Sequence, residues 1–301
     1  MIFATLSDSK YLTYGMSMYH SLKESATTDF ELHYLCTDEE AYNRISEIGF
    51  SDIKPYRLED IDSEDFQLLK KNNKRDDGTH PDGHCGFHWA LSSYFTNFIL
   101  HKEKECLYVD SDVLFYRDPK LIFDSVAGYS IGLITHKHQS FESNSRSGYY
   151  NVGIVYFRND EVGIKCSDWW KRVVIDIDNE YFLTHGTCGD QKYLELFGVL
   201  FGQEKIKIID EDIGHGAPWN FPQSEIDIEN QKITWDSQFV MKQGKVTQDL
   251  VFNHFSHFNP NYEEGWYAVD RHGEWGNILP NLGISDVYNH YFMITRNIMK
   301  Y

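Results

Sequence analysis

The chain has 301 residues, 41% of them hydrophobic and 25% charged, so it can bury a sizeable core as one large domain or two small ones. Its formal net charge of −18 argues against nucleic acid and anionic membrane as main partners, because both require a basic face. The 5 cysteines are scattered without a Cys-x-x-Cys pair, which favours a reducing compartment over structural zinc or a disulfide framework.

The first half of the chain alternates predicted strands with predicted helices. It enters a strand over 2–6 almost at once, and neither a charged-then-apolar leader nor a run of membrane-spanning length is seen, so we expect a cytoplasmic protein without a transmembrane segment. A helix is expected over about 14–24, a strand over 30–35, and a helix that begins at Thr37 as N-cap and ends near Ile48. A weaker strand covers 53–58, and the polar residues 59–86 predict a loop or lid with a short helix near 66–70. The clearest amphipathic helix covers 87–99 and leads into a strand that ends at Val109.

The second half is more irregular. A short helix follows Pro119, and strands are expected over 130–135, 149–157 and 205–209, with a polar loop over 136–147. A helical stripe over 166–177 places two tryptophans in the core, and another helix runs from about 189 to 197. Short strands over 233–252 and a closing helix over 285–301 complete the chain. The alternation in the first half predicts an α/β fold with a mostly parallel central sheet.

Two aspartates, Asp110 and Asp112, directly follow the strand that ends at Val109, and apolar residues resume after them. In open α/β sheets, ligands bind outside the carboxyl ends of the strands. Neighbouring carboxylates repel each other, and a divalent cation that bridges them to a diphosphate would stabilise both. The flanking apolar runs, rather than the spacing, distinguish this pair. The same spacing recurs at Asp60/Asp62, Asp176/Asp178 and Asp210/Asp212.

Several motifs then occur in an order shared with a known family. They are Ala4-Thr5-Leu6-x-Asp8-x-x-Tyr11, Leu107-Tyr108-Val109-Asp110-Ser111-Asp112, Asn151-Val152-Gly153-Ile154, Gly189-Asp190-Gln191, Trp219-Asn220-Phe221 and His254-Phe255. Together they resemble family 8 glycosyltransferases such as glycogenin and the bacterial lipopolysaccharide galactosyltransferases. The resemblance spans nearly the whole chain and implies the GT-A fold, in which a Rossmann-like, mostly parallel central sheet is flanked by helices and accompanied by a smaller mixed part on the acceptor side. We expect one domain over 1–301, with a nucleotide-binding half over about 1–115 and an acceptor-side half and closing helix over about 116–301.

The resemblance also implies a donor site at the start of the chain. Asp8 would bind the uracil N–H or the ribose hydroxyls, Tyr11 would stack on the base, and Thr5 would contribute from the strand end. Asp110, Ser111 and Asp112 would also contact the donor. The expected partners are therefore a nucleotide sugar, in particular a UDP-sugar, and a glycan or other hydroxyl acceptor.

The implied metal site consists of Asp110, Asp112 and His254, with His257 as the alternative to His254. A neutral imidazole beside two carboxylates favours Mn²⁺, with Mg²⁺ as the second choice. The implied catalytic side chains are Asn151, Asp190 and Gln191, which would line the donor sugar in a transfer that retains the α configuration. Asp190 or Gln191 would stabilise the oxocarbenium-like charge, and Asp190 as a covalent nucleophile is a further hypothesis.

Two departures from the family pattern keep other functions open. No lysine follows His254 in the usual G-x-x-K-P-W pattern, and Asn97 aligns with an arginine that often precedes the D-x-D strand. The residues available to replace these two basic groups are Lys70, Lys71, Lys74 and Arg75 of the lid, or alternatively His80, His84 and His88. The leading prediction is a metal-dependent hexosyltransferase. The alternatives are a non-catalytic nucleotide-sugar or carbohydrate-binding protein and, ranked lower for want of a Gly-rich basic loop after the first strand, a sugar-1-phosphate nucleotidyltransferase.

Overall fold

A central seven-stranded sheet organises the part of the chain that the computed structural model describes, which is residues 1–72, 84–138, 141–176, 190–229, 233–234, 236–269 and 281–299. The strand order is β3-β2-β1-β4-β7-β6-β8. The strands are β1 (Ile2–Ser7), β2 (Glu31–Cys36), β3 (Ile53–Tyr56), β4 (Glu105–Val109), β6 (Ile131–Thr135), β7 (Tyr150–Arg158) and β8 (Ile206–Ile208). β1, β2, β3 and β4 pair in parallel, whereas β7 is antiparallel to both β4 and β6. The predicted α/β class with a mostly parallel sheet is confirmed.

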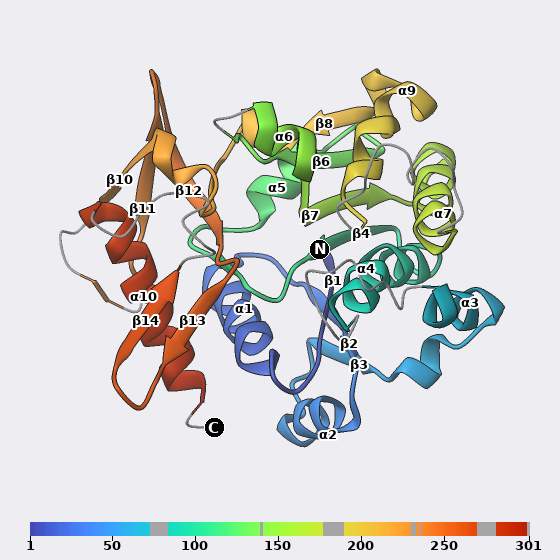
Figure 1. The fold of residues 1–301 in the computed structure, drawn as a ribbon, viewed down its shortest axis with the longest axis horizontal. Coiled ribbons are helices and arrows are strands. Elements are labelled where there is room, and N and C mark those ends of the chain that lie inside the picture. The colour runs from blue at the N-terminus through green and yellow to red at the C-terminus, as the bar shows by residue number, and fades with distance from the viewer. Residues whose placement is uncertain are drawn as a thin grey trace.

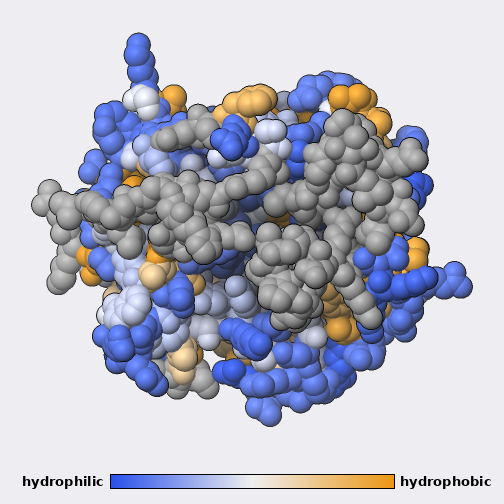
Figure 2. Space-filling view, in the orientation of Figure 1, coloured by the Kyte–Doolittle hydropathy of each residue, from blue (hydrophilic) through white to orange (hydrophobic). Residues whose placement is uncertain are grey.

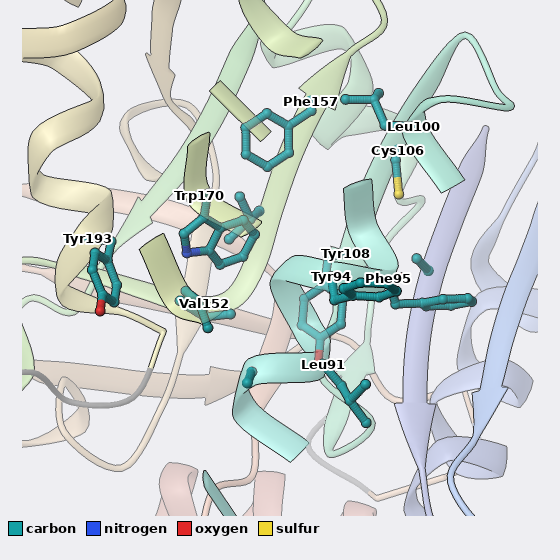
Figure 3. Packing of buried hydrophobic residues seen from close by; sticks show 14 of the residues in the cluster. Leu91, Tyr94, Phe95, Leu100, Cys106, Tyr108, Val152, Phe157, Trp170 and Tyr193 are labelled. Atoms are coloured by element: carbon teal, nitrogen blue, oxygen red, sulfur yellow. The ribbon is translucent and has the colours of Figure 1, made fainter. Parts of the chain in front are cut away.

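Helices cover both faces of this sheet because successive strand residues point to opposite sides. In β4, Leu107 packs with α1 (Leu12–Ser25), α2 (Glu39–Ile48) and α5 (Lys120–Ser125), and the adjacent Tyr108 packs with α3 (Glu64–Asn72), α4 (His84–Leu100) and α7 (Glu161–Ile175). Figure 3 shows the second of these clusters, in which Phe95 of α4, Tyr108 of β4 and Trp170 of α7 are buried. The core position predicted for the tryptophans is thus confirmed for Trp170, which is completely buried.

A second, smaller sheet lies beside the first. Its order is β10-β11-β12-β5, and β9 also pairs with β12. Its strands are β5 (Val113–Phe115), β9 (Gly214–Gly216), β10 (Ser224–Ile228), β11 (Phe239–Gln243) and β12 (Val246–His254). These strands, the hairpin β13 (Phe258–Asn261) and β14 (Trp266–Val269), and the closing helix α10 (Leu282–Ile298) gather on one side of the molecule next to α1 (Figure 1). β4 belongs to the first sheet and β5 to the second, so the segment Asp110–Asp112 joins the two sheets.

The remaining elements are short. Among the described residues they are α6 (Phe141–Ser147), α9 (Phe197–Phe201) and the 3₁₀ helices η1 (Leu58–Ile61), η2 (Lys192–Leu196), η3 (Gln203–Lys205), η4 (Ile209–Glu211) and η5 (Phe221–Gln223). Two expectations are wrong. The predicted polar loop over 136–147 contains α6, and the N-cap of α2 is Asp38 rather than Thr37. Thr37 contacts His88 through its hydroxyl, which leaves the Asp38 carboxylate to accept the amide of Ala41.

The surface is largely polar. Most of the described surface that faces the viewer in Figure 2 is hydrophilic, in line with the 25% of charged residues. Among the described helices, none combines the length and the apolar character that crossing a membrane requires. The large apolar side chains with the greatest exposure are Phe141 of α6 and Val199 of α9.

Candidate metal and donor site

The connection from β4 to β5 is a tight turn that presents two carboxylates. The amide of Val113 donates to the carbonyl of Asp110 at 3.1 Å, which closes the turn around Ser111. The amide of Asp110 donates to the carbonyl of Gly153 on β7, and the Tyr108 hydroxyl donates to Asp110 Oδ1 at 2.9 Å. The turn is therefore anchored to the central sheet at the carboxyl end of β4, where an α/β sheet binds its ligands.

β12 brings an imidazole to the same place. Its antiparallel pairing with β5 sets His254 opposite Val113, and the amide of Phe255 donates to the carbonyl of Asp112 at 2.8 Å. Nε2 of His254 lies 3.0 Å from Asp112 Oδ1 and 3.7 Å from Asp110 Oδ2. One potential ligand atom from each of the three residues lies within 4.8 Å of the others. His257, the alternative ligand, is exposed beyond the end of β12 and has a left-handed backbone, with φ of 60°.

The pKa of each of the three side chains is shifted by at least one of the other two. Burial and the charge of Asp112 raise the pKa of Asp110 despite the opposing effect of His254. Burial also acts to raise the pKa of Asp112, but the charge and hydrogen bond of His254 outweigh it and the net shift is downward. For His254, burial acts to lower the pKa, and the two carboxylates outweigh it and raise the pKa. The group therefore favours a positive charge between its two carboxylates, which is the condition that a cation would satisfy.

Asn151 on β7 contacts the Nδ1 side of the His254 ring. Its Oδ1 is 3.3 Å from Nδ1 of His254, and its Nδ2 donates to Oε1 of Gln191 at 2.9 Å. Gln191 also accepts the amide of Val152 and donates to the carbonyl of Ser147. Gly153 is required here because a Cβ would lie 2.5 Å from both Asn151 Oδ1 and His254 Nδ1.

Asp190 is buried between α4 and α7. The Ser92 hydroxyl of α4 donates to Asp190 Oδ2, and the indole of Trp170 on α7 donates to its backbone carbonyl at 2.9 Å. Burial, and to a smaller extent the charge of Asp110, raises the pKa of Asp190 to about 7 against the effect of the Ser92 hydrogen bond. A carboxyl with such a pKa exchanges its proton near neutral pH, and perturbed pKa values of this kind cluster at functional sites.

The predicted nucleoside side chains cluster at the carboxyl end of β1. Asp8 is buried and its Oδ1 accepts the amide of Tyr11, whereas the Tyr11 ring is 52% exposed. Thr5 is completely buried, and its hydroxyl makes no hydrogen bond within the described residues. The loop after β1 is fixed because both the amide and the hydroxyl of Ser9 donate to Asp38 Oδ2.

A second group of potential ligands occurs in the described part of the chain, at the opposite end of the sheet. Glu31 begins β2, and His33 Nε2 lies 2.8 Å from its Oε1 and 3.8 Å from Glu103 Oε1. The ammonium of Lys54 already lies 2.6 Å from the same Glu31 oxygen. The Glu31 carboxylate is already paired with the Lys54 ammonium, so the group of Asp110, Asp112 and His254 is the stronger metal candidate.

Comparisons with known proteins place this geometry in context. No protein-family model matches the chain. Two Bacillus subtilis (strain 168) proteins, the uncharacterized YfnF and YfnD, are 26% and 27% identical over 84% and 85% of this chain and 80% and 77% of their own. The galactosyltransferase LgtC with donor and acceptor sugar analogues superposes with a TM-score of 0.50 at 15% identity, over 74% of this chain and 77% of LgtC. A variant of LgtC with an active-site glutamine changed to glutamate superposes at 0.53 and 12% identity, over 87% and 89%.

The chain has the GT-A glycosyltransferase fold. Within the GT-A architecture, the donor set of the Asp110 group fits a divalent cation, since the β4–β5 turn offers carboxylate oxygens and the end of β12 offers an imidazole nitrogen. Gly189, Lys74 and Arg75, which the sequence also indicated, lie outside the described residues. Lys70 and Lys71 are exposed on α3.

Sequence reasoning missed two residues of the candidate site. Asn97, which aligns with an arginine of the family pattern, donates through its amide to Ser167 and Asp168 of α7. The α4 residue that contacts the site is Ser92, through Asp190. The other missed residue is His136, whose Nε2 lies 3.1 Å from Asn151 Nδ2. Its signal in the sequence was its position directly after a buried strand.

Proposed function

We propose that this GT-A protein is a metal-dependent glycosyltransferase that moves a hexose from a UDP-sugar to a saccharide or other hydroxyl acceptor, with retention of configuration. The observation that supports the proposal most strongly is the convergence of Asp110, Asp112 and His254 at the carboxyl edge of the sheet. The shared fold with LgtC supports the same class of reaction, because LgtC is a galactosyltransferase.

Asp110, Asp112 and His254 would hold the divalent cation, with Mn²⁺ preferred to Mg²⁺ because one ligand is an imidazole. When bound, the cation supplies positive charge that neutralises the departing nucleoside diphosphate. Because the pKa of His254 is raised, a proton competes with the cation for its Nε2 up to a higher pH than at an ordinary histidine. The turn around Ser111 would bring its own backbone close to the diphosphate.

The nucleoside would lie over the loop after β1. The exposed Tyr11 ring offers a face on which a base can stack, and Tyr14 supports it at a ring-centroid distance of 5.2 Å. The buried carboxylate of Asp8 is suited to a uracil N–H or to ribose hydroxyls, because a buried acceptor gains most from a donor. The contribution of Thr5 remains a prediction.

The sugar would then lie near Asp190 and Gln191. With a pKa of about 7, Asp190 is available in both its proton-donating and its charged form at neutral pH, and the charged form would stabilise an oxocarbenium-like centre. Gln191 is fixed by the Val152 amide and the Ser147 carbonyl, so its amide dipole has a defined direction. The active-site glutamine of LgtC supports a role for a glutamine in such a site.

The test is a panel of nucleotide sugars, each incubated with Mn²⁺ or with a chelator, with release of nucleoside diphosphate as the readout. We expect slow, Mn²⁺-dependent hydrolysis of a UDP-hexose, and NMR of the first sugar released should show the α anomer. Binding of the UDP-sugar without any turnover, in the presence of candidate acceptors, would instead favour the non-catalytic binding protein. Absence of both binding and turnover across the panel would contradict the proposal.

A further inference from the structure

The side chain of Asn151 has no hydrogen-bonding capacity left for a substrate. An asparagine amide offers two N–H donors and an oxygen with two acceptor positions. Nδ2 donates to Gln191 Oε1 at 2.9 Å and contacts His136 Nε2 at 3.1 Å. Oδ1 accepts the amide of Gly153 at 2.8 Å and lies 3.3 Å from Nδ1 of His254. Since the Gly153 amide can only donate, the atom that it contacts must be the oxygen, which fixes the orientation of the whole amide.

This orientation determines which nitrogen of His254 carries a proton. Asn151 Oδ1 can only accept, so Nδ1 of His254 is the donor. Nε2 is then the nitrogen whose lone pair becomes available beside Asp110 and Asp112. A hydrogen bond to the distal ring nitrogen is the usual means by which a protein sets the tautomer and the orientation of a histidine that binds metal.

The Asn151 amide also determines the protonation state of His136. Asn151 Nδ2 can only donate, so Nε2 of His136 must accept and its ring must be neutral. The ring is buried directly after β6, stacks on His138 at a centroid distance of 4.5 Å, and meets the Trp219 ring edge-on at 5.3 Å. Trp219 in turn packs edge-on against the His254 ring at 5.1 Å. His136 and His254 are thus connected twice, through the Asn151 amide and through the Trp219 ring.

We propose that Asn151 and His136 are positioning residues of the metal site: His136 orients the Asn151 amide, and Asn151 presents Nε2 of His254 to the cation and fixes Gln191. This assignment rests on the proposed function, and it replaces the expectation that Asn151 contacts the donor sugar. It differs from a sugar-contact role in one measurable respect. A positioning residue affects metal affinity when no donor is present, whereas a sugar contact does not.

The experiment measures Mn²⁺ affinity without nucleotide, from the electron paramagnetic resonance signal of free Mn²⁺, alongside turnover of the UDP-sugar. Asn151→Leu removes every hydrogen bond of the amide and should weaken Mn²⁺ binding by about 10- to 100-fold, the usual loss for such a residue. Asn151→Asp still accepts from Gly153 and His254 but cannot donate. It should bind Mn²⁺ at least as tightly as the wild type, while turnover falls because Gln191 is released.

Two matched variants of residue 136 test whether His136 supports the metal site through the Asn151 amide. His136→Gln can place a carbonyl oxygen where Nε2 accepts, and it should keep the affinity for Mn²⁺ near that of the wild type. His136→Leu fills a similar space but offers no hydrogen-bond acceptor, so it should weaken the binding of Mn²⁺. Circular dichroism checks that each variant folds. If Asn151→Leu does not fold, the two variants of residue 136 still test the proposal, because this residue lies farther from the metal ligands.

The outcomes separate the two proposals. If Asn151→Leu and His136→Leu bind Mn²⁺ like the wild type but lose turnover, the positioning role is overturned and the transferase proposal stands. If the wild type binds no Mn²⁺ and releases no nucleoside diphosphate from any donor, the proposed function fails, and the positioning role fails with it. Weakened Mn²⁺ binding in both leucine variants, with retention in His136→Gln, supports the inference.

Discussion

Replacing Asp190 by asparagine should change how the stability of the protein depends on pH. Asp190 is only 6% exposed, and burial is the main reason why its pKa rises from an ordinary 3.8 to about 7. The asparagine amide has the shape of the protonated carboxyl and can still accept the hydrogen bond from Ser92. The substitution therefore removes the ionisation while it leaves the packing and this contact in place.

The size of the effect follows from linkage between folding and protonation. Because the pKa of Asp190 is higher in the folded state than in the unfolded state, the associated stability is present below pH 3.8 and is lost as the pH rises through about 7. A tenfold change in an ionisation constant corresponds to about 1.4 kcal/mol, so the full loss is about 4 kcal/mol, of which about 3 kcal/mol falls above pH 5. The asparagine variant lacks this loss.

Urea denaturation of both proteins at about pH 5 and pH 8.5, in the presence of a chelator, measures the difference. The free energy of unfolding of Asp190→Asn relative to the wild type should increase between the two pH values by about 3 kcal/mol. The chelator is needed because a cation near Asp110 would favour the ionised carboxylate. A relative stability that does not change with pH would refute the reasoning. The same variant tests the nucleophile hypothesis, since near-normal transferase activity would exclude a covalent role for Asp190.

Three further predictions concern the metal ligands and their support. Gly153→Ala should weaken Mn²⁺ binding by about 10- to 100-fold, because its Cβ would lie 2.5 Å from Nδ1 of His254 and from Asn151 Oδ1; unchanged affinity in a Mn²⁺ titration would count against this packing. His254→Ala should abolish tight Mn²⁺ binding whereas the exposed His257→Ala should retain it, and the reverse result would make His257 the ligand. Because the pKa of His254 is raised in the folded state, its stabilising charge is present below pH 6.5 and is lost as the pH rises through the folded-state value. Mn²⁺ should therefore raise the melting temperature more at pH 8 than at pH 6, and equal stabilisation at both would contradict this assignment.

The carboxylate pair could be located from sequence because its signal is local. A buried strand that ends in Asp110 and Asp112 places them at the ligand-binding edge of an α/β sheet, whatever the rest of the chain does. His254 could be paired with them only through the family resemblance, since the sequence does not show that β12 would lie beside β5. The structure supplies that pairing, with His254 opposite Val113.

The remaining differences arise from contacts between distant segments. Thr37 and Asp38 are both good N-cap residues, and the choice between them depends on His88, which engages Thr37 from α4. Ser92 has no local pattern that distinguishes it from an ordinary polar residue, and His136 is marked only by its position directly after the buried strand β6. Their importance appears only when β6, β7 and α4 are brought together around Asn151 and Asp190.

The measurement that tests the central claim most directly is calorimetric titration of the protein with UDP, with Mn²⁺ and with a chelator. The double variant Asp110→Asn/Asp112→Asn is compared with Asp60→Asn/Asp62→Asn, which removes the same number of charges at the same spacing from a site on and beside η1. We predict that the wild type and the Asp60/Asp62 variant bind UDP only with Mn²⁺, and that the Asp110/Asp112 variant does not bind. UDP binding that survives the chelator, or that survives the loss of Asp110 and Asp112, would contradict the account.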